Sequence, residues 1–143
     1  MNVLVPYDGS EYAKEALRHA VDTYPDARLH VLHVIDPVYR GGEKQPKAAW
    51  WNMWYEDREK RAQTLLDEAR EMLDDHGRDV TTEHRTGKPS EEILLSIQEN
   101  DIDVVVMGRQ GESGLSRLLL GSSAKRVARH ADIPVTLVGE TSR

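Results

Sequence analysis

The residues of this sequence best suited to chemistry form a glycine- and serine-rich segment between positions 108 and 123. Gly108 to Gly111 follows an apolar run, and Gly121 to Ser123 comes nine residues later. Glycines let the backbone turn sharply and expose successive N–H groups, and such a concavity binds anions. The second group precedes an amphipathic segment, and the start of a helix also favours negative charge. The spacing therefore predicts a site for two or three phosphates.

Both parts of this segment also have a purely structural interpretation. Gly108 is compatible with an ordinary turn, and either Ser122 or Ser123 is compatible with the N-cap of the following helix. Their occurrence together after one strand favours phosphate binding, while a capping role for the serines stays open from the sequence.

Apolar periodicity divides the whole chain into alternating strands and helices. Short apolar or alternating runs predict five strands, over residues 2–6, 29–35, 80–85, 102–107 and 134–138. Apolar residues at intervals of three and four predict helices over about 13–24, 51–76, 89–100 and 124–131. Residues 36–49 contain Gly and Pro breakers and are predicted to form a loop, and Gly77 lies where a helix C-cap is expected.

This order of elements predicts one α/β domain over residues 1–143. Strands that alternate with helices form a parallel sheet with helices on both faces, so we expect three layers and a doubly wound, five-stranded sheet. Such sheets bind ligands at the carboxyl ends of their strands, where the winding reverses. Two strand ends carry unusual residues, at positions 6–10 and 108–123.

These segments resemble the universal stress protein family. The resemblance rests on the pattern G-x2-G-x9-G-S, placed between a strand that ends in Val-Val-Met and a helix. It implies a flavodoxin-like sheet with strand order 3-2-1-4-5, and ATP binding, because every position of the motif is present. Other segments that carry it are Val5 to Ser10, His33 to Asp36, Gly114-Leu115, Leu118 to Ser122 and His130 to Val135.

The resemblance also implies the residues of an ATP site, with or without Mg²⁺. Asp8 would lie beside the ribose or adenine, Val34 beside the adenine, and Ser122 at the phosphates. The alternatives are an N-cap role for Asp8, with Ser10 as a competing cap, and plain core positions for Val34 and Met107. The predicted binding residues are Pro6, Asp8, Val34, Met107, Gly108, Arg109, Gln110, Gly111, Gly121, Ser122 and Ser123.

Composition argues against several other classes of function. The net charge of −6 is unsuited to nucleic-acid binding, which needs a basic surface. No apolar run approaches the roughly 20 residues that span a bilayer, so no membrane insertion is expected. The chain has no cysteine and no P-loop, dinucleotide-binding or nucleophile-elbow motif. We therefore expect a cytoplasmic protein, and the sequence identifies neither catalytic nor metal-binding residues.

Three functions remain compatible with these observations. The preferred one is an ATP-binding protein that uses the nucleotide as a regulatory or structural ligand in a stress response. The alternatives are a slow ATP-hydrolysing or phosphotransfer enzyme with the same pocket, and an interaction module without nucleotide. Phosphoryl transfer needs a group that orients the nucleophile and a bound metal, and Asp8 is the one carboxylate expected in the pocket. A homodimer through residues 134–138 is also expected, whereas no role is assigned to the loop 36–49 or to Trp50, Trp51 and Trp54.

Overall fold

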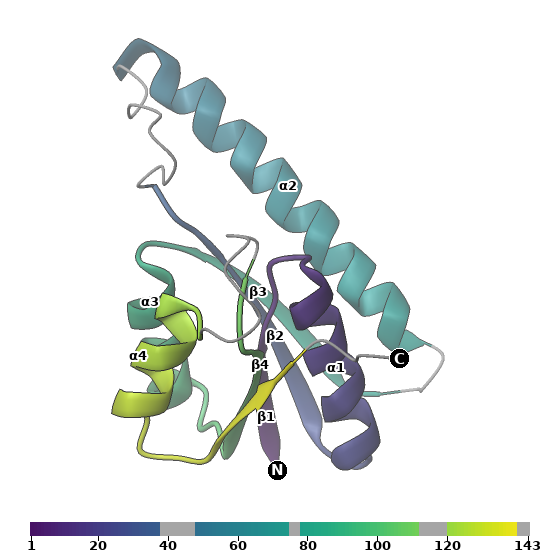
Figure 1. The fold of residues 1–143 in the computed structure, drawn as a ribbon. Coiled ribbons are helices and arrows are strands. Elements are labelled where there is room, and N and C mark those ends of the chain that lie inside the picture. Colours follow the sequence, from purple (N-terminus) through teal and green to yellow (C-terminus); the bar gives the residue numbers. More distant parts are fainter. Residues whose placement is uncertain (38–47, 75–77, 112–119, 140–143) are drawn as a thin grey trace.

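The computed structural model of the protein describes residues 1–37, 48–74, 78–111 and 120–139, with residues 48–51 and 74 described by their backbone. A parallel sheet with the strand order β3-β2-β1-β4-β5 lies between two layers of helices (Figure 1). The expected fold class and strand order are therefore confirmed. The strands are β1 (Asn2–Pro6), β2 (Arg28–Ile35), β3 (Val80–Thr86), β4 (Val104–Gly108) and β5 (Val135–Val138). The helices are α1 (Glu11–Thr23), α2 (Ala48–Asp74), α3 (Pro89–Glu99) and α4 (Ser122–His130).

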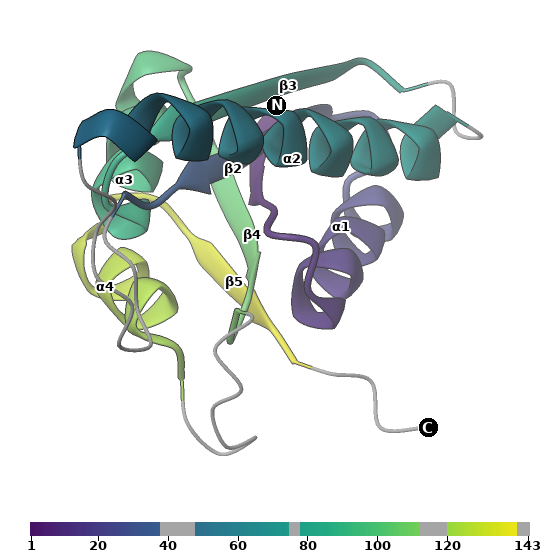
Figure 2. The same ribbon diagram turned by 90° about the horizontal axis from the view of Figure 1, so that it is seen from above.

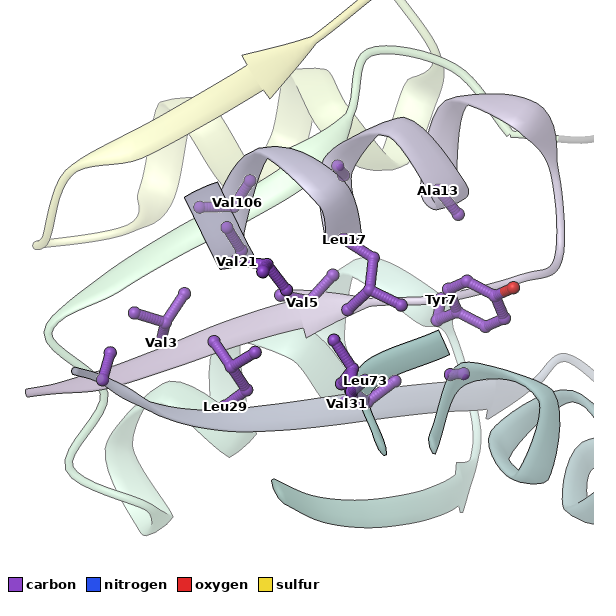
Figure 3. Close-up of a cluster of buried hydrophobic side chains, with 14 of the residues drawn as sticks. Val3, Val5, Tyr7, Ala13, Leu17, Val21, Leu29, Val31, Leu73 and Val106 are labelled. Atoms are coloured by element: carbon purple, nitrogen blue, oxygen red, sulfur yellow. The ribbon is translucent and has the colours of Figure 1, made fainter. Parts of the chain in front are cut away.

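Two apolar cores hold the three layers together, one on each face of the sheet. Val3 and Val5 of β1 pack with Leu17 of α1 and Leu73 of α2 (Figure 3). Leu4, which lies between them in the strand, faces the core that α3 and α4 cover. This alternation follows from the side-chain period of two residues in a strand. Seen from above, α1 and α2 lie on one side of the sheet and α3 and α4 on the other (Figure 2).

The start of β4 differs from the sequence-based expectation. The strand begins at Val104 rather than at Ile102. Asp101 adopts a positive φ of 52°, and the N–H of Ile102 donates to the carbonyl group of Ile97 at 3.1 Å. Ile102 therefore closes the end of α3 and is buried as a core residue before the strand starts.

Helix α2 also begins earlier than expected, at Ala48. Trp54 is half-buried, and the guanidinium carbon of Arg58 lies 5.5 Å from its ring centroid, a cation–π contact within the helix. No helix in the described part of the chain, α2 included, is both long and apolar enough to cross a membrane. Outside the described residues lie most of the predicted loop 36–49, the side chains of Trp50 and Trp51, His76, and the predicted C-cap Gly77.

The turn between β1 and α1 decides the capping question at Asp8. Ser10 is the N-cap of α1, because its Oγ accepts a hydrogen bond from the backbone N–H of Ala13 at 3.2 Å. Asp8 instead accepts the backbone N–H of Ser10 through Oδ1 at 2.9 Å, a local turn that Asp side chains commonly form. The alternative that Asp8 caps the helix is therefore wrong. Its second oxygen, Oδ2, lies beside Gly111.

Candidate functional site

A pocket opens where β1, β2 and β4 end. Its lining comes from the ends of these strands, the turn after β1, and the first turns of α3 and α4. β1 and β4 are neighbours in the sheet, but the chain leaves β1 for β2 on the other side, so this is the point where the winding reverses. Every predicted binding residue except Arg109 lines the pocket.

One part of the pocket is apolar. Leu32 and Val34 of β2, Pro89 and Ile93 of α3, and Met107 of β4 form it. Leu32, Ile93 and Met107 are buried and also belong to the core between the sheet and α3. Met107 is therefore a core residue that also lines the pocket, and its contact with a nucleotide stays a prediction. Apolar walls from three elements suit a flat ring system.

The other part of the pocket is built from backbone around two glycine-containing segments. The N–H of Gly121 donates to the carbonyl group of Arg109 at 2.8 Å, which joins the segment after β4 to the start of α4. Gly121 is the N-cap of α4, and no side chain caps the helix there. The capping interpretation of Ser122 and Ser123 is therefore wrong, since both already lie inside the helix. The first N–H groups of a helix carry partial positive charge, so this part attracts anions.

Two glycines of this segment are required by close packing. A Cβ at Gly108 would lie 2.7 Å from Tyr12 Cβ and 2.9 Å from the Tyr12 carbonyl carbon, so the end of β4 lies directly against α1. A Cβ at Gly111 would lie 2.7 Å from Asp8 Oδ2, so this glycine leaves room for the carboxylate. Gly108 therefore supports the fold, whereas Gly111 shapes the pocket.

The described lining contains one carboxylate, that of Asp8, and one phenol, that of Tyr7. Burial raises the pKa of Tyr7, and the negative charges of Glu68 and Asp8 raise it further. The phenol therefore stays neutral at physiological pH and does not serve as a base there. No three His, Asp or Glu side chains within the described ranges are grouped to hold a metal ion.

The side chain of Arg109 does not line the pocket. The chain bends at both residues after β4, and there Gln110 lines the pocket while Arg109 does not. A Cβ at Gly139, just beyond the end of β5, would lie 3.3 Å from Arg109 Cδ, so the side chain of Arg109 lies against the end of β5. Its Nε is buried without a hydrogen-bond partner among the residues that the structure describes. Contact between Arg109 and a phosphate stays a prediction.

Several lining residues were not identified from the sequence. His33 Nδ1 lies 2.8 Å from the carbonyl oxygen of Tyr7, and this nitrogen carries the hydrogen because a carbonyl group only accepts. Leu32 could have been predicted, because side chains two residues apart in a strand share a face and Val34 was already placed in the pocket. The sequence contains no signal that brings α3 to the pocket. The residues missed are Tyr7, Ala13, Leu32, His33, Pro89, Ile93 and Ala124.

Comparison with known proteins decides the family. Residues 1–139 match the universal stress protein family. The chain belongs to this family. Universal stress protein MJ0531 of Methanocaldococcus jannaschii is 33% identical over 138 residues, which cover 95% of this chain and 80% of that protein.

Solved structures of universal stress proteins share the fold. Protein MJ0577 of Methanocaldococcus jannaschii is 28% identical, with a TM-score of 0.84 that covers 99% of this chain and 97% of that chain. A family protein from Arabidopsis thaliana, solved with AMP bound, is 18% identical with a TM-score of 0.74, over 99% of this chain and 93% of that chain. At 18% identity, the similarity to the Arabidopsis protein shows a shared fold alone. The matched range of this universal stress protein includes every predicted binding residue.

Proposed function

We propose that this universal stress protein binds ATP in the pocket at the carboxyl ends of β1, β2 and β4, and uses the nucleotide in the cytoplasm as a regulatory or structural ligand. The observation that supports this most is the composition of the pocket. Apolar walls from β2, α3 and β4 lie in the same pocket as glycine backbone and the first turn of α4. An adenine ring needs the first kind of surface and a triphosphate needs the second.

The chemistry of each part suggests how ATP would lie. The adenine would lie between Val34 and Ile93, the ribose beside Gly111, and the phosphates would accept hydrogen bonds from the backbone at the start of α4 and from Ser122 and Ser123. Asp8 would accept hydrogen bonds from the ribose hydroxyl groups, because a carboxylate attracts hydroxyl donors and repels phosphates. The AMP bound to the Arabidopsis protein of the same fold supports an adenine nucleotide as the ligand class.

A ligand role for ATP is favoured over rapid turnover. Asp8 is the one carboxylate among the described lining residues, and in this arrangement the ribose engages it. Phosphoryl transfer needs a group placed beside the attacking water or hydroxyl. We therefore expect hydrolysis well below the typical enzyme turnover of about 10 per second.

Binding of ATP is expected to raise the melting temperature by on the order of 10 °C. A ligand at 100 times its dissociation constant stabilises the fold by about 2.7 kcal/mol, and a domain of this size converts that energy into such a shift. The measurement is a thermal melt of protein that chromatography has shown to be free of nucleotide. Sodium chloride of the same ionic strength is the control for unspecific salt effects. No shift with millimolar ATP and Mg²⁺ would remove the proposal.

Replacing both serines at the start of α4 with alanine is expected to weaken ATP binding roughly 10- to 150-fold. This corresponds to the loss of about 1.5–3 kcal/mol, the usual contribution of a hydrogen bond to a charged group. Neither Ser122 nor Ser123 is the N-cap, so no capping bond is removed together with the phosphate contact. Calorimetric titration of the double variant with ATP gives the loss directly.

Adenosine is the matched ligand for this test. Because it has no phosphate, it should bind the double variant and the unchanged protein equally. Equal losses for ATP and adenosine would mean that the pocket had distorted as a whole. An ATP affinity that does not change would assign phosphate binding to the glycine backbone alone.

We further propose that two copies pair through β5 to form a homodimer. β5 lies at the edge of the sheet, pairs with β4 along one side, and its four residues are all half-buried. An apolar edge strand with a free side offers its backbone to another chain, and two-fold pairing closes both edges at once.

A lysine in this edge strand should separate the two copies. Val135→Lys places a charge in the expected interface, so light scattering should give the mass of a monomer. Thr81→Lys is the matched control, because Thr81 is exposed on β3 at the opposite edge of the sheet. A monomeric unchanged protein would contradict the proposed dimer.

A further inference from the structure

A group of charged side chains lies on the α3 side of the sheet, next to the apolar part of the pocket. Arg85 of β3 is at its centre and only 13% of its side chain is exposed. Its Nε lies 3.2 Å from Glu83 Oε1, its Nη2 2.5 Å from Glu99 Oε2, and its Nη1 3.9 Å from Glu92 Oε1. His30 Nε2 lies 3.1 Å from the same oxygen of Glu83. Glu92 and Glu99 belong to α3, so Arg85 ties this helix to the sheet.

Glu83 and Arg85 are held in their charged forms. Burial alone would raise the pKa of Glu83, but the hydrogen bond with His30 and the positive charge of Arg85 outweigh it and lower this pKa. Burial opposes the charge of Arg85 as well, yet the negative charge of Glu83 and the hydrogen bond to Glu99 raise its pKa. Arg85 is therefore a positive charge that lies largely buried between Glu83 and the two carboxylates of α3, of which Glu92 is 21% and Glu99 58% exposed.

Arg85 is directly beside a residue of the pocket without lining the pocket itself. It pairs with Val34 in the register of β2 and β3, and side chains of paired residues in a parallel sheet share a face. Val34 lines the pocket, and so do Pro89 and Ile93 of α3. We call the part of the pocket between Val34 and α3 the slot. Its width depends on how closely α3 is held to β3.

Of the two α3 carboxylates near Arg85, Glu92 is the one in the first turn of the helix, at 3.9 Å. A Cβ at Gly87 would lie 2.9 Å from Glu92 Oε2 and 3.0 Å from its Cγ, so this side chain is packed between Gly87 and Arg85. The N–H of Gly87 donates to the carbonyl group of Ile35 at 2.9 Å, which joins the turn to the end of β2. Pro89 follows two residues later as the first residue of α3. Displacement of Glu92 would therefore move the part of α3 that forms the pocket wall.

The geometry points to Arg85 as a positioning residue that, through Glu92, holds α3 at the distance from Val34 that fits a purine ring. The inference rests on the proposed function, because it assigns the slot between Val34 and Ile93 to the base of the nucleotide. Arg85 itself would touch no part of the ligand. It would act only on the end of the pocket that receives the base.

The test compares ligands that contain the base with one that does not. Arg85→Met and Glu92→Gln should each weaken adenosine and ATP by about tenfold, comparable with the loss of a group that orients a ligand-binding side chain. Tripolyphosphate should bind these variants as it binds the unchanged protein. Binding is measured by calorimetry well below the melting temperature of every variant. Glu92→Gln keeps the test usable where Arg85→Met does not fold.

Arg70→Met is the matched control. Arg70 of α2 is also tied to β3, through a 3.0 Å hydrogen bond from Nη2 to Thr82 Oγ1, but it lies on the face away from α3. The affinity of Arg70→Met for adenosine should stay within about twofold of the affinity of the unchanged protein. Equal weakening by Arg70→Met, or equal losses for tripolyphosphate and adenosine, would mean general loosening and would overturn the inference.

The two proposals fail in different ways. If the unchanged protein binds neither ATP nor adenosine, the proposed function is wrong and this inference falls with it. If the unchanged protein binds both, and Arg85→Met and Glu92→Gln still bind adenosine within twofold, only the positioning role is wrong. Partial recovery of adenosine affinity in Arg85→Lys, which keeps the charge, would support the role of the ion pair.

Discussion

Gly108→Ala should destabilise the protein by about 3 kcal/mol, although it adds a single methyl group. The new Cβ would lie 2.7 Å from Tyr12 Cβ and 2.9 Å from the Tyr12 carbonyl carbon. The second of these atoms belongs to the backbone of α1, so the helix must move away from the sheet. Overpacking of this kind costs about 1–3 kcal/mol, and a clash with backbone belongs at the upper end. Urea denaturation followed by circular dichroism measures the free energy of unfolding.

Gly111→Ala is the matched control three residues later. Among the described residues its Cβ would meet Asp8 alone, with Oδ2 at 2.7 Å, and a partly exposed carboxylate can rotate away. We expect a stability loss of about 1 kcal/mol or less, but weaker ATP binding because the carboxylate has moved. Gly108→Ala should therefore mainly lower the stability of the protein, whereas Gly111→Ala should mainly lower its affinity for ATP. Equal stability losses would show that α1 does not constrain Gly108.

Arg78→Ala should cost about 3 kcal/mol as well, because one side chain serves three backbone carbonyl groups. Arg78 donates from Nη1 to Val21 O at 3.1 Å, and from Nη2 to Ala27 O at 2.9 Å and to Tyr24 O. Helix α1 has no basic residue in its last turn, so Arg78 supplies the positive charge that favours a helix C-terminus. Each hydrogen bond to a charged group contributes about 1.5–3 kcal/mol, though not additively.

Two comparisons separate this anchor from an ordinary surface charge. Arg78→Lys should recover part of the stability, since lysine keeps the charge but loses the planar fork that reaches several acceptors. Arg28→Ala removes a neighbouring 2.9 Å ion pair with Asp79, in which both side chains are more than 60% exposed. Such pairs contribute about 0–1 kcal/mol. A loss at Arg78 no larger than the loss at Arg28 would contradict the anchoring role.

The sequence by itself determined the order of the strands and helices and the two strand ends that carry the pocket. These follow from local patterns, since a strand buries every second side chain and a helix buries every third or fourth. The carboxyl ends of parallel strands share one edge of the sheet, so the segments 6–10 and 108–123 were expected at the same edge. The strand order 3-2-1-4-5 came from the family resemblance, because periodicity does not say which strands are neighbours.

Only the tertiary structure decided the roles that depend on contacts between distant segments. Ser10 rather than Asp8 caps α1, and Gly121 rather than a serine caps α4, because the path of each turn selects among adjacent capping residues. Arg109 lies outside the pocket because the chain after β4 turns Gln110 inward.

Arg78 and Arg85 look alike in the sequence, as arginines in polar segments. One closes the end of a helix more than fifty residues earlier in the chain, whereas the other ties α3 beside the pocket. Charge and residue type are local properties of a sequence. The partner of a charge is set by which segments the folded core brings together, and no local pattern contains that information.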